Sequence, residues 1–265
     1  MSLGCAATLS ACGGGGGTGS PASPATSNAS ASATAASTAP KSHVTIYLDG
    51  GSTNWGADID STVKEQSPAV GQGVVGRASP SPAQLMQTDF DAALGAGVVT
   101  VIDGATPGAT FQADLQATGV VAQSISARLG SLTTPADLVL SNFEINDQYV
   151  LAESPQTYAS WEQQWVQTVK AAGATPVLQE PNPICEPGFN IPVTDEFVAQ
   201  TRQLASTQGI TLLPTYDAFK LYPLWNLTTG LMSSDCVHPN ETGYAFKEAH
   251  YFPVLLPVVR KLLAQ

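Results

Sequence analysis

The sequence predicts an α/β protein, with a three-layer α/β/α sandwich built around a central parallel sheet of about five strands. Short apolar runs alternate along the chain with longer segments whose apolar residues recur at helical spacing. The apolar runs are nearly continuous, as expected of parallel strands that are buried on both faces. Strands and helices that alternate in this way form one parallel sheet with helices on both of its faces.

The expected elements follow one another in chain order. Ser81 is expected to cap the first helix, which closes at Gly95 or Gly97. Pro253 and Pro257 are expected to interrupt the last helix, because proline lacks the N–H that a helix interior needs. The predicted strands are 43–49, 98–103, 137–143, 175–180 and 210–216. The predicted helices are 81–97, 154–173, 194–208 and a last one from about residue 241.

The composition divides the chain into three parts. Residues 13–42 consist almost wholly of Gly, Ser, Ala, Thr and Pro, with no large apolar side chain up to Pro40. Such a segment cannot bury enough surface to offset the entropy of ordering it, so a disordered tether is expected. Residues 43–265 are enough for one α/β domain with a sizeable core.

Residues 1–12 resemble the end of a bacterial lipoprotein signal. Leu9-Ser10-Ala11-Cys12 looks like a lipobox, although no Lys or Arg precedes Cys12. The resemblance implies an exported bacterial protein, either secreted or held at the periplasmic or outer cell surface by lipidation of Cys12. The alternative is a start that is rich in Ala and Gly by chance.

The charge and the cysteines exclude several classes of function. The chain has 10 Lys and Arg against 21 Asp and Glu, and no basic run, which argues against nucleic-acid binding. No CxxC pair or Cys/His cluster has the spacing of a metal site, so no metal is expected. If the signal is real, Cys5 is removed and Cys185 and Cys236 remain, and these are expected to pair. Two separately buried thiols are the alternative.

Polar residues follow the predicted strands, at the edge of a parallel sheet where ligands bind. Ser52 follows the first strand after two glycines, and Asp235 and His238 lie in a loop near the C-terminus. A serine nucleophile needs an imidazole to take its proton and a carboxylate to orient that imidazole. His43 begins a strand at the wrong end of the sheet and His250 lies within a helix, so His238 is the candidate base.

Together, four loops resemble the sequence blocks of the SGNH hydrolase superfamily, also called GDSL lipases and esterases, over residues 43–265. Ser52 matches the first block, and Asp235 and His238 match the Asp-x-x-His of the last. Gly108 matches the second block, with Gly104 as a competitor, and Asn146 matches the third. Two departures are Gly51, where the family usually has Asp, and Glu144, where it usually has Gly.

The resemblance implies a flavodoxin-like fold and a serine hydrolase that cleaves carboxylic esters without a cofactor. It implies an oxyanion hole formed by the backbone N–H groups of Ser52 and Gly108 and by the side-chain amide of Asn146. Trp55 and Tyr149 adjoin these loops and are expected to contact a small-molecule, glycan or lipid ester. Residues 68–80 are expected to form a long loop over the cleft, and loops such as 57–80 are expected to set the depth of the pocket.

Two alternatives stay open at this level. A catalytically silent surface lipoprotein could use the same fold to bind a glycan or a lipid. Among enzymes, a carbohydrate O-acetylesterase competes with a short-chain esterase and a lysophospholipase.

Overall fold

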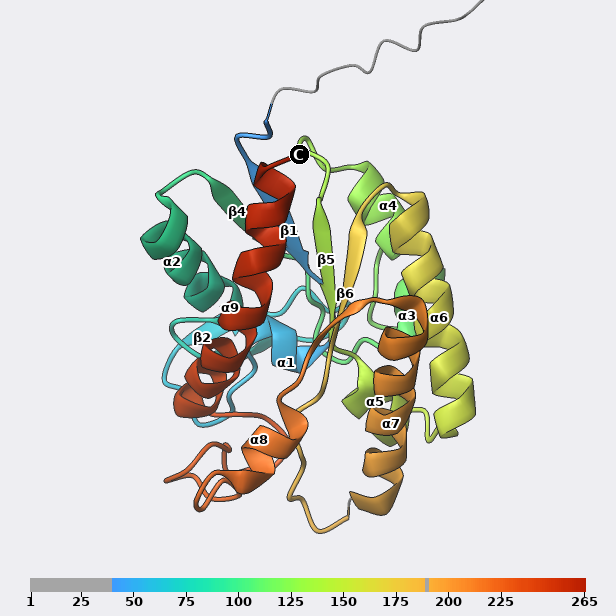
Figure 1. The fold of residues 1–265 in the computed structure, drawn as a ribbon. Coiled ribbons are helices and arrows are strands. Elements are labelled where there is room, and N and C mark those ends of the chain that lie inside the picture. Colours follow the sequence, from blue (N-terminus) through green and yellow to red (C-terminus); the bar gives the residue numbers. More distant parts are fainter. Residues whose placement is uncertain (1–39, 189–190) are drawn as a thin grey trace, which may run out of the picture. The chain divides into compact units, whose positions relative to one another are not determined.

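A computed structural model describes residues 40–188 and 191–265 of the protein. Its centre is a sheet of five parallel strands in the order β4-β1-β5-β6-β7 (Figure 1). The predicted parallel sheet is thereby confirmed. The expected signal remnant at 1–12, with Cys5 and Cys12, and most of the expected tether lie outside the described residues. The strands are β1 (Val44–Leu48), β4 (Val99–Asp103), β5 (Leu138–Ser141), β6 (Thr175–Gln179) and β7 (Thr211–Leu213).

Helices cover both faces of this sheet (Figure 1). On one face, α2 (Pro82–Leu94) and α9 (Glu241–Leu263) pack on the strands and enclose one apolar core. On the other face, a second core lies beneath four helices. The predicted three-layer sandwich is therefore confirmed. The four helices are α3 (Phe111–Gln116), α4 (Ile125–Gly130), α6 (Pro155–Ala171) and α7 (Ile191–Gln208).

Strand β1 lies inside the sheet, between β4 and β5, and contributes to both cores. Val44, Ile46 and Leu48 pack toward α2 and α9, whereas Tyr47 packs into the opposite core, as the alternation of side chains along a strand requires. The neighbours of β1 are β4 on one side and β5 on the other. The connection after β1 leads to β4 on one side, and the chain then returns to form β5 on the other side. The connections therefore diverge between β1 and β5, and this leaves a crevice at the carboxyl ends of these two strands.

The last helix differs from the expectation. Pro253 and Pro257 lie inside a continuous α9 and do not interrupt it. Both prolines are exposed, so the carbonyl groups that lose their helical partner face solvent. Tyr251, Leu255 and Val259 form a fully buried stripe on the opposite side of the helix. The burial of that stripe against the sheet outweighs the local cost of the prolines.

The segment expected to be one long loop also contains regular structure. Strands β2 (Lys64–Gln66) and β3 (Val74–Gly76) form an antiparallel hairpin. The chain also forms the short helices α1 (Ser52–Trp55), α5 (Glu144–Tyr149) and α8 (Tyr216–Leu221). Within residues 40–188 and 191–265, no helix combines the length and the apolar character that a membrane span requires.

Candidate active site

Ser52 is the first residue of α1, directly beyond the carboxyl end of β1. Gly50 has a φ of +133°, and a Cβ there would lie 2.6 Å from the backbone oxygen of Asn142. Only glycine allows both this conformation and this approach. The N–H of Gly51 donates to the same Asn142 oxygen over 2.8 Å. The two glycines therefore bring the start of α1 against the exit of β5, where Ser52 is placed.

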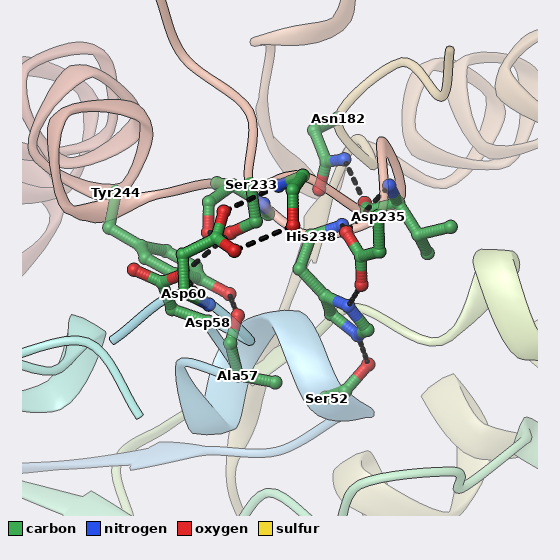
Figure 2. Close-up of polar contacts among 12 residues, drawn as sticks. Ser52, Ala57, Asp58, Asp60, Asn182, Ser233, Asp235, His238 and Tyr244 are labelled. Atoms are coloured by element: carbon green, nitrogen blue, oxygen red, sulfur yellow. Dashed lines mark hydrogen bonds and ion pairs between the residues drawn. The ribbon is translucent and has the colours of Figure 1, made fainter. Parts of the chain in front are cut away.

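His238 and Asp235 complete a chain of hydrogen bonds with Ser52 (Figure 2). The Oγ of Ser52 lies 2.8 Å from Nε2 of His238, although the two residues are 186 positions apart. Nδ1 of the same ring lies 2.5 Å from Oδ2 of Asp235. The structure thus brings together the serine, imidazole and carboxylate that the sequence singled out.

The Asp235 carboxylate is suited to hold the ring. Its Oδ1 accepts the backbone N–H groups of Val237 and His238, each over 3.0 Å. Burial alone would raise the pKa of Asp235, but the hydrogen bonds and charge of His238 and the two backbone donors lower it below its usual value. The carboxylate therefore stays ionised and fixes the proton of His238 on Nδ1, leaving Nε2 to face Ser52.

The loop that carries His238 is also held from the side of β6. Cys236 forms a disulfide with Cys185, and the Cys185 N–H donates to the Cys236 oxygen over 2.9 Å. The side chain of Asn182 donates to the oxygen of Val237 over 3.0 Å. Cys236 itself has a φ of +58°, an unusual backbone conformation for a residue other than glycine. The disulfide and these hydrogen bonds fix the imidazole of His238 at the edge of the sheet.

Reduction of the disulfide is expected to lower both the melting temperature and the activity. The bridge closes a separation of 51 residues, for which loop-closure entropy gives a stabilisation of about 4 kcal/mol. Melting and initial rates measured with and without a reductant test this expectation. A Cys185→Ser/Cys236→Ser variant serves as control, because reductant has no bridge to break in it. Equal melting temperatures for the reduced and oxidised wild type would contradict the expectation.

Gly108 and Asn146 line one cavity together with Ser52 and His238. This cavity, called the serine cavity below, has a volume of about 400 Å³. Gly108 has a φ of +81° in a turn that the Ala109 N–H closes on the oxygen of Thr106. With Pro107 before it, Gly108 occupies the position where a type II turn requires glycine.

Gly104, the competing glycine, lies elsewhere. Its N–H donates to the oxygen of Leu48 over 2.9 Å, in continuation of the sheet. A Cβ at Gly104 would lie 2.0 Å from the ring of Tyr47. Gly104 is therefore explained by packing, whereas Gly108 lies beside Ser52.

Gly51, the first departure from the family pattern, lies against the side chain of Asn146. A Cβ at Gly51 would lie 2.7 Å from Nδ2 of Asn146. That amide donates one hydrogen to the oxygen of Ala109 over 2.9 Å, and Asn146 reaches the serine cavity from α5. Glycine at position 51 thus leaves room for the amide group of Asn146.

Glu144, the second departure, is buried with its side chain among other carboxyl groups. Its side chain is 2 % exposed, and burial, followed by the nearby Glu162 and Asp147, raises its pKa well above the usual value. Burial likewise raises the pKa of Asp147, and it raises the pKa of Glu162 to about 8. The surroundings of Glu144 therefore favour its uncharged form.

Sequence reasoning did not single out Asp49, which ends the segment before the two glycines. Asp49 is fully buried and accepts hydrogen bonds from Nη2 of Arg128 and Nε1 of Trp165, over 3.1 and 2.9 Å. Arg128 also pairs with Asp114 and donates to the oxygen of Gly104 over 2.7 Å. The sequence signal for these buried contacts of Asp49 was the presence of a carboxylate at the end of an otherwise apolar run.

Neither of the two residues expected to contact substrate lines the serine cavity. Trp55 is 3 % exposed, and the guanidinium of Arg77 lies 4.7 Å from the centre of its ring. Trp55 lines a second cavity of about 700 Å³, called the polar cavity below. Tyr149 ends α5 and is 59 % exposed. No group of three or more His, Cys, Asp or Glu in the described part of the chain could hold a metal ion.

Comparison with known proteins identifies the family. The model of the GDSL-like lipase/acylhydrolase family matches residues 60–246, which include Gly108, Asn146, Asp235 and His238 and begin after Ser52. No curated protein sequence matches the chain.

Solved structures of similar fold include a lipase/acylhydrolase from Enterococcus faecalis, with 19% identity and a TM-score of 0.60 over 83% of this chain and 95% of that one. The esterase EstA of a Pseudoalteromonas species has 17% identity and a TM-score of 0.57, over 82% and 98%. An acetylxylan esterase from Geobacillus stearothermophilus has 17% identity and a TM-score of 0.57, over 81% and 96%. The fold is therefore shared with these proteins, and the extent of the family match shows that this chain belongs to the GDSL-like lipase/acylhydrolase family of ester hydrolases.

Proposed function

We propose that the protein hydrolyses carboxylic esters with Ser52 as nucleophile, His238 as general base and acid, and Asp235 as the group that orients His238. One observation carries the proposal. The imidazole of His238 lies 2.8 Å from the Ser52 hydroxyl through Nε2 and 2.5 Å from the Asp235 carboxylate through Nδ1. These are the contacts that turn a weakly acidic hydroxyl into a nucleophile.

The reaction passes through an acyl-enzyme. Oγ of Ser52 forms a bond to the ester carbonyl carbon while its proton moves to Nε2 of His238. The tetrahedral intermediate then expels the alcohol, which takes the proton from His238. A water molecule gives a proton to His238 and attacks the acyl-serine, and collapse of the second intermediate returns that proton to Ser52 and releases the acid. Asp235 stabilises the imidazolium in both steps.

The oxyanion that forms in both steps needs donors, and three groups around the serine cavity are suited to supply them. These are the backbone N–H groups of Ser52 and Gly108 and the side-chain amide of Asn146. The amide of Asn146 carries two hydrogens, of which one is engaged by Ala109, so the other is available to an oxyanion. A preorganised donor of this kind contributes about 3–4 kcal/mol to transition-state stabilisation.

The walls of the serine cavity suit an uncharged acyl group. Ile59, Val75 and Pro107 line it together with the small residues Ala57 and Gly76. Apolar walls bind an acyl group by removing its surface from water. No Asp, Glu, Lys or Arg side chain lines this cavity in the part of the chain that the structure describes.

Covalent trapping tests the proposal. An organophosphonate ester that imitates the tetrahedral intermediate is expected to inactivate the wild type with one adduct per chain, found by mass spectrometry on the peptide with Ser52. The Ser52→Ala variant is expected to take up no adduct. An adduct on another residue, or none on the wild type at full exposure to the reagent, would contradict the proposal and favour a silent binding protein.

The polar cavity favours a second, narrower function, the removal of an acyl group from a polyhydroxylated alcohol such as a sugar. The two cavities adjoin along one loop, since Ala105 and Thr106 line the polar cavity and Pro107 and Gly108 line the serine cavity. The hairpin of β2 and β3 contributes residues to both cavities.

The charges of the polar cavity suit a neutral ligand. Arg77 is paired with Glu65 and Asp103, and Arg128 with two buried carboxylates, so neither guanidinium is free to attract an anion. Paired charges still offer donors and acceptors to hydroxyl groups. The polar cavity is thus suited to the alcohol part of a sugar ester.

A substrate panel separates the two functions. Gln123 is exposed at the polar cavity, and Gln123→Leu is expected to lower kcat/KM for an acetylated xylo-oligosaccharide about 10-fold, the loss of one hydrogen bond to substrate. The rate with p-nitrophenyl acetate is expected to stay unchanged. Gln164→Leu, an exposed substitution on α6, is the control. Equal effects of Gln123→Leu on both substrates would contradict the narrower function.

A further inference from the structure

Two acidic residues join the segment after the nucleophile to the loop that carries His238 (Figure 2). Oδ1 of Asp58 accepts the hydroxyl of Ser233 over 2.7 Å. The carboxylate of Asp60 accepts the backbone N–H of Ser234 and its hydroxyl, each over 2.6 Å. These residues, Asp58, Asp60, Ser233 and Ser234, are called the clamp below. None of them lies in the hydrogen-bond chain from Ser52 to Asp235.

On the histidine side, the clamp holds a loop that is braced internally. The N–H of Ser233 donates to the oxygen of His238 over 2.8 Å, and the N–H of Cys236 donates to the oxygen of Ser233 over 3.0 Å. Asp235 binds the backbone of His238 within the same turn. Residues 233–238 therefore move together, and a shift of Ser233 or Ser234 is passed on to the imidazole of His238.

On the serine side, the clamp is attached to a rigid extension of α1. The N–H groups of Gly56 and Ala57 both donate to the oxygen of Ser52 over 2.9 Å. The hydroxyl of Tyr244, from α9, donates to the oxygen of Ala57 over 2.6 Å. The Asp58 N–H donates to Gly76 in β3 over 3.1 Å. Asp58 therefore has a fixed position relative to Ser52.

We propose that Asp58 and Asp60 are positioning residues, which set the distance between the Ser52 hydroxyl and the His238 imidazole by clamping their two loops together. The disulfide and Asn182 hold the far side of the 233–238 loop, whereas the clamp holds the side that faces α1. The kinetic part of this inference rests on the proposed function of Ser52 and His238. The structural part concerns the placement of the imidazole alone.

The two halves of the clamp differ in what their loss does to the fold. Asp58 and Ser233 are buried, so their substitution also removes buried hydrogen bonds and destabilises the protein. Asp60 and Ser234 are exposed, and exposed substitutions generally change stability little. The exposed half therefore separates positioning from stability.

The test uses Asp60→Ala, which removes both acceptors, in the full chain with an activated ester as substrate. The expected result is a fall in kcat of about 10- to 100-fold, the effect of a misplaced catalytic group, with KM unchanged. Asp60→Asn is expected to retain most of the wild-type kcat, because its amide oxygen still accepts the Ser234 N–H. Ser234→Ala combined with Asp60→Ala is expected to be no worse than Asp60→Ala alone, since the hydroxyl has already lost its partner.

Asp217→Ala is the matched control. Asp217 is an exposed carboxylate on α8 that also accepts a hydrogen bond from another element, Nη2 of Arg202. Its loss is expected to leave kcat unchanged. If Asp60→Ala lowers kcat no more than Asp217→Ala does, or only in proportion to a fall in the folded fraction, the clamp proposal is overturned.

A measurement on the imidazole itself keeps the proposal separate from the proposed function. The proton between Nδ1 of His238 and the Asp235 carboxylate is expected to give a low-field proton resonance, and the chain has three histidines in all. Asp60→Ala is expected to shift or broaden this resonance, and Asp217→Ala to leave it in place. An identical resonance in wild type and Asp60→Ala overturns the clamp whether or not the protein turns over esters. Absence of hydrolysis in the wild type overturns the proposed function alone.

Discussion

The Ser52→Ala variant is expected to hydrolyse p-nitrophenyl acetate with a kcat about 10⁴- to 10⁶-fold below that of the wild type. Without the hydroxyl, the imidazole of His238 can only activate water directly, and no acyl-enzyme forms. Initial rates measured with excess ester, together with a melting curve for each protein, check this expectation.

Combination with His238→Ala sharpens the result. Because Ser52 and His238 act as one unit in the proposed mechanism, the double variant is expected to be no slower than Ser52→Ala alone. Ser206→Ala, an exposed serine substitution on α7, is the control and is expected to keep the wild-type rate. Equal rates of wild type and Ser52→Ala would show that Ser52 takes no part in the reaction.

The Arg128→Met variant is expected to lose about 3–5 kcal/mol of unfolding free energy. Arg128 pairs with Asp49 and Asp114, whose side chains are each 1% exposed. Its removal leaves two buried carboxylates next to each other without a cation, directly behind the turn that leads to Ser52. Urea unfolding followed by circular dichroism measures the loss.

The pH dependence of that loss has a definite sign. Burial, and after it the neighbouring Asp49, already raises the pKa of Asp114 well above its usual value, while Arg128 opposes the rise. A carboxyl group whose pKa is raised in the folded state stabilises the fold less as the pH rises above its unfolded pKa. The loss in Arg128→Met is therefore expected to be larger at pH 8 than at pH 5.

Two further variants identify the cause of the loss. Arg128→Met combined with Asp114→Asn is expected to recover part of the stability, because one unpaired carboxylate is gone. Arg260→Met, at an exposed position in the last turn of α9, is expected to cost less than about 1 kcal/mol. A double variant as unstable as Arg128→Met at every pH would contradict the electrostatic explanation.

The strands of the sheet could be predicted from the sequence because burial on both faces requires continuous apolar runs. β1 and β5 are fully buried, and the predictions matched them to within a few residues. The hairpin of β2 and β3 carries no such signal, since Lys64, Glu65 and Gln66 are all exposed and only three residue pairs define it. The short helices α3 and α4 were not predicted because six residues are too few to show a helical period, although Thr110 and Ser124 cap them.

At the site, residues with an obvious chemical role could be found from the sequence, but their surroundings could not. Asp235 and His238 are three positions apart, and their pairing is nearly local. The partners of Asp58 and Asp60, in contrast, lie 174 to 175 positions away and only folding reveals them. Trp55 is only three positions after Ser52 in the sequence, yet its side chain lines a different cavity.

The buried carboxyl groups of Glu144, Asp147 and Glu162 have a consequence for the whole molecule. Folding raises the pKa of each group, that of Glu162 to about 8, so the folded protein binds these protons more tightly than the unfolded chain does. The folded protein is therefore expected to be less stable in alkali than in mild acid, because rising pH ionises carboxyl groups that are buried in the core.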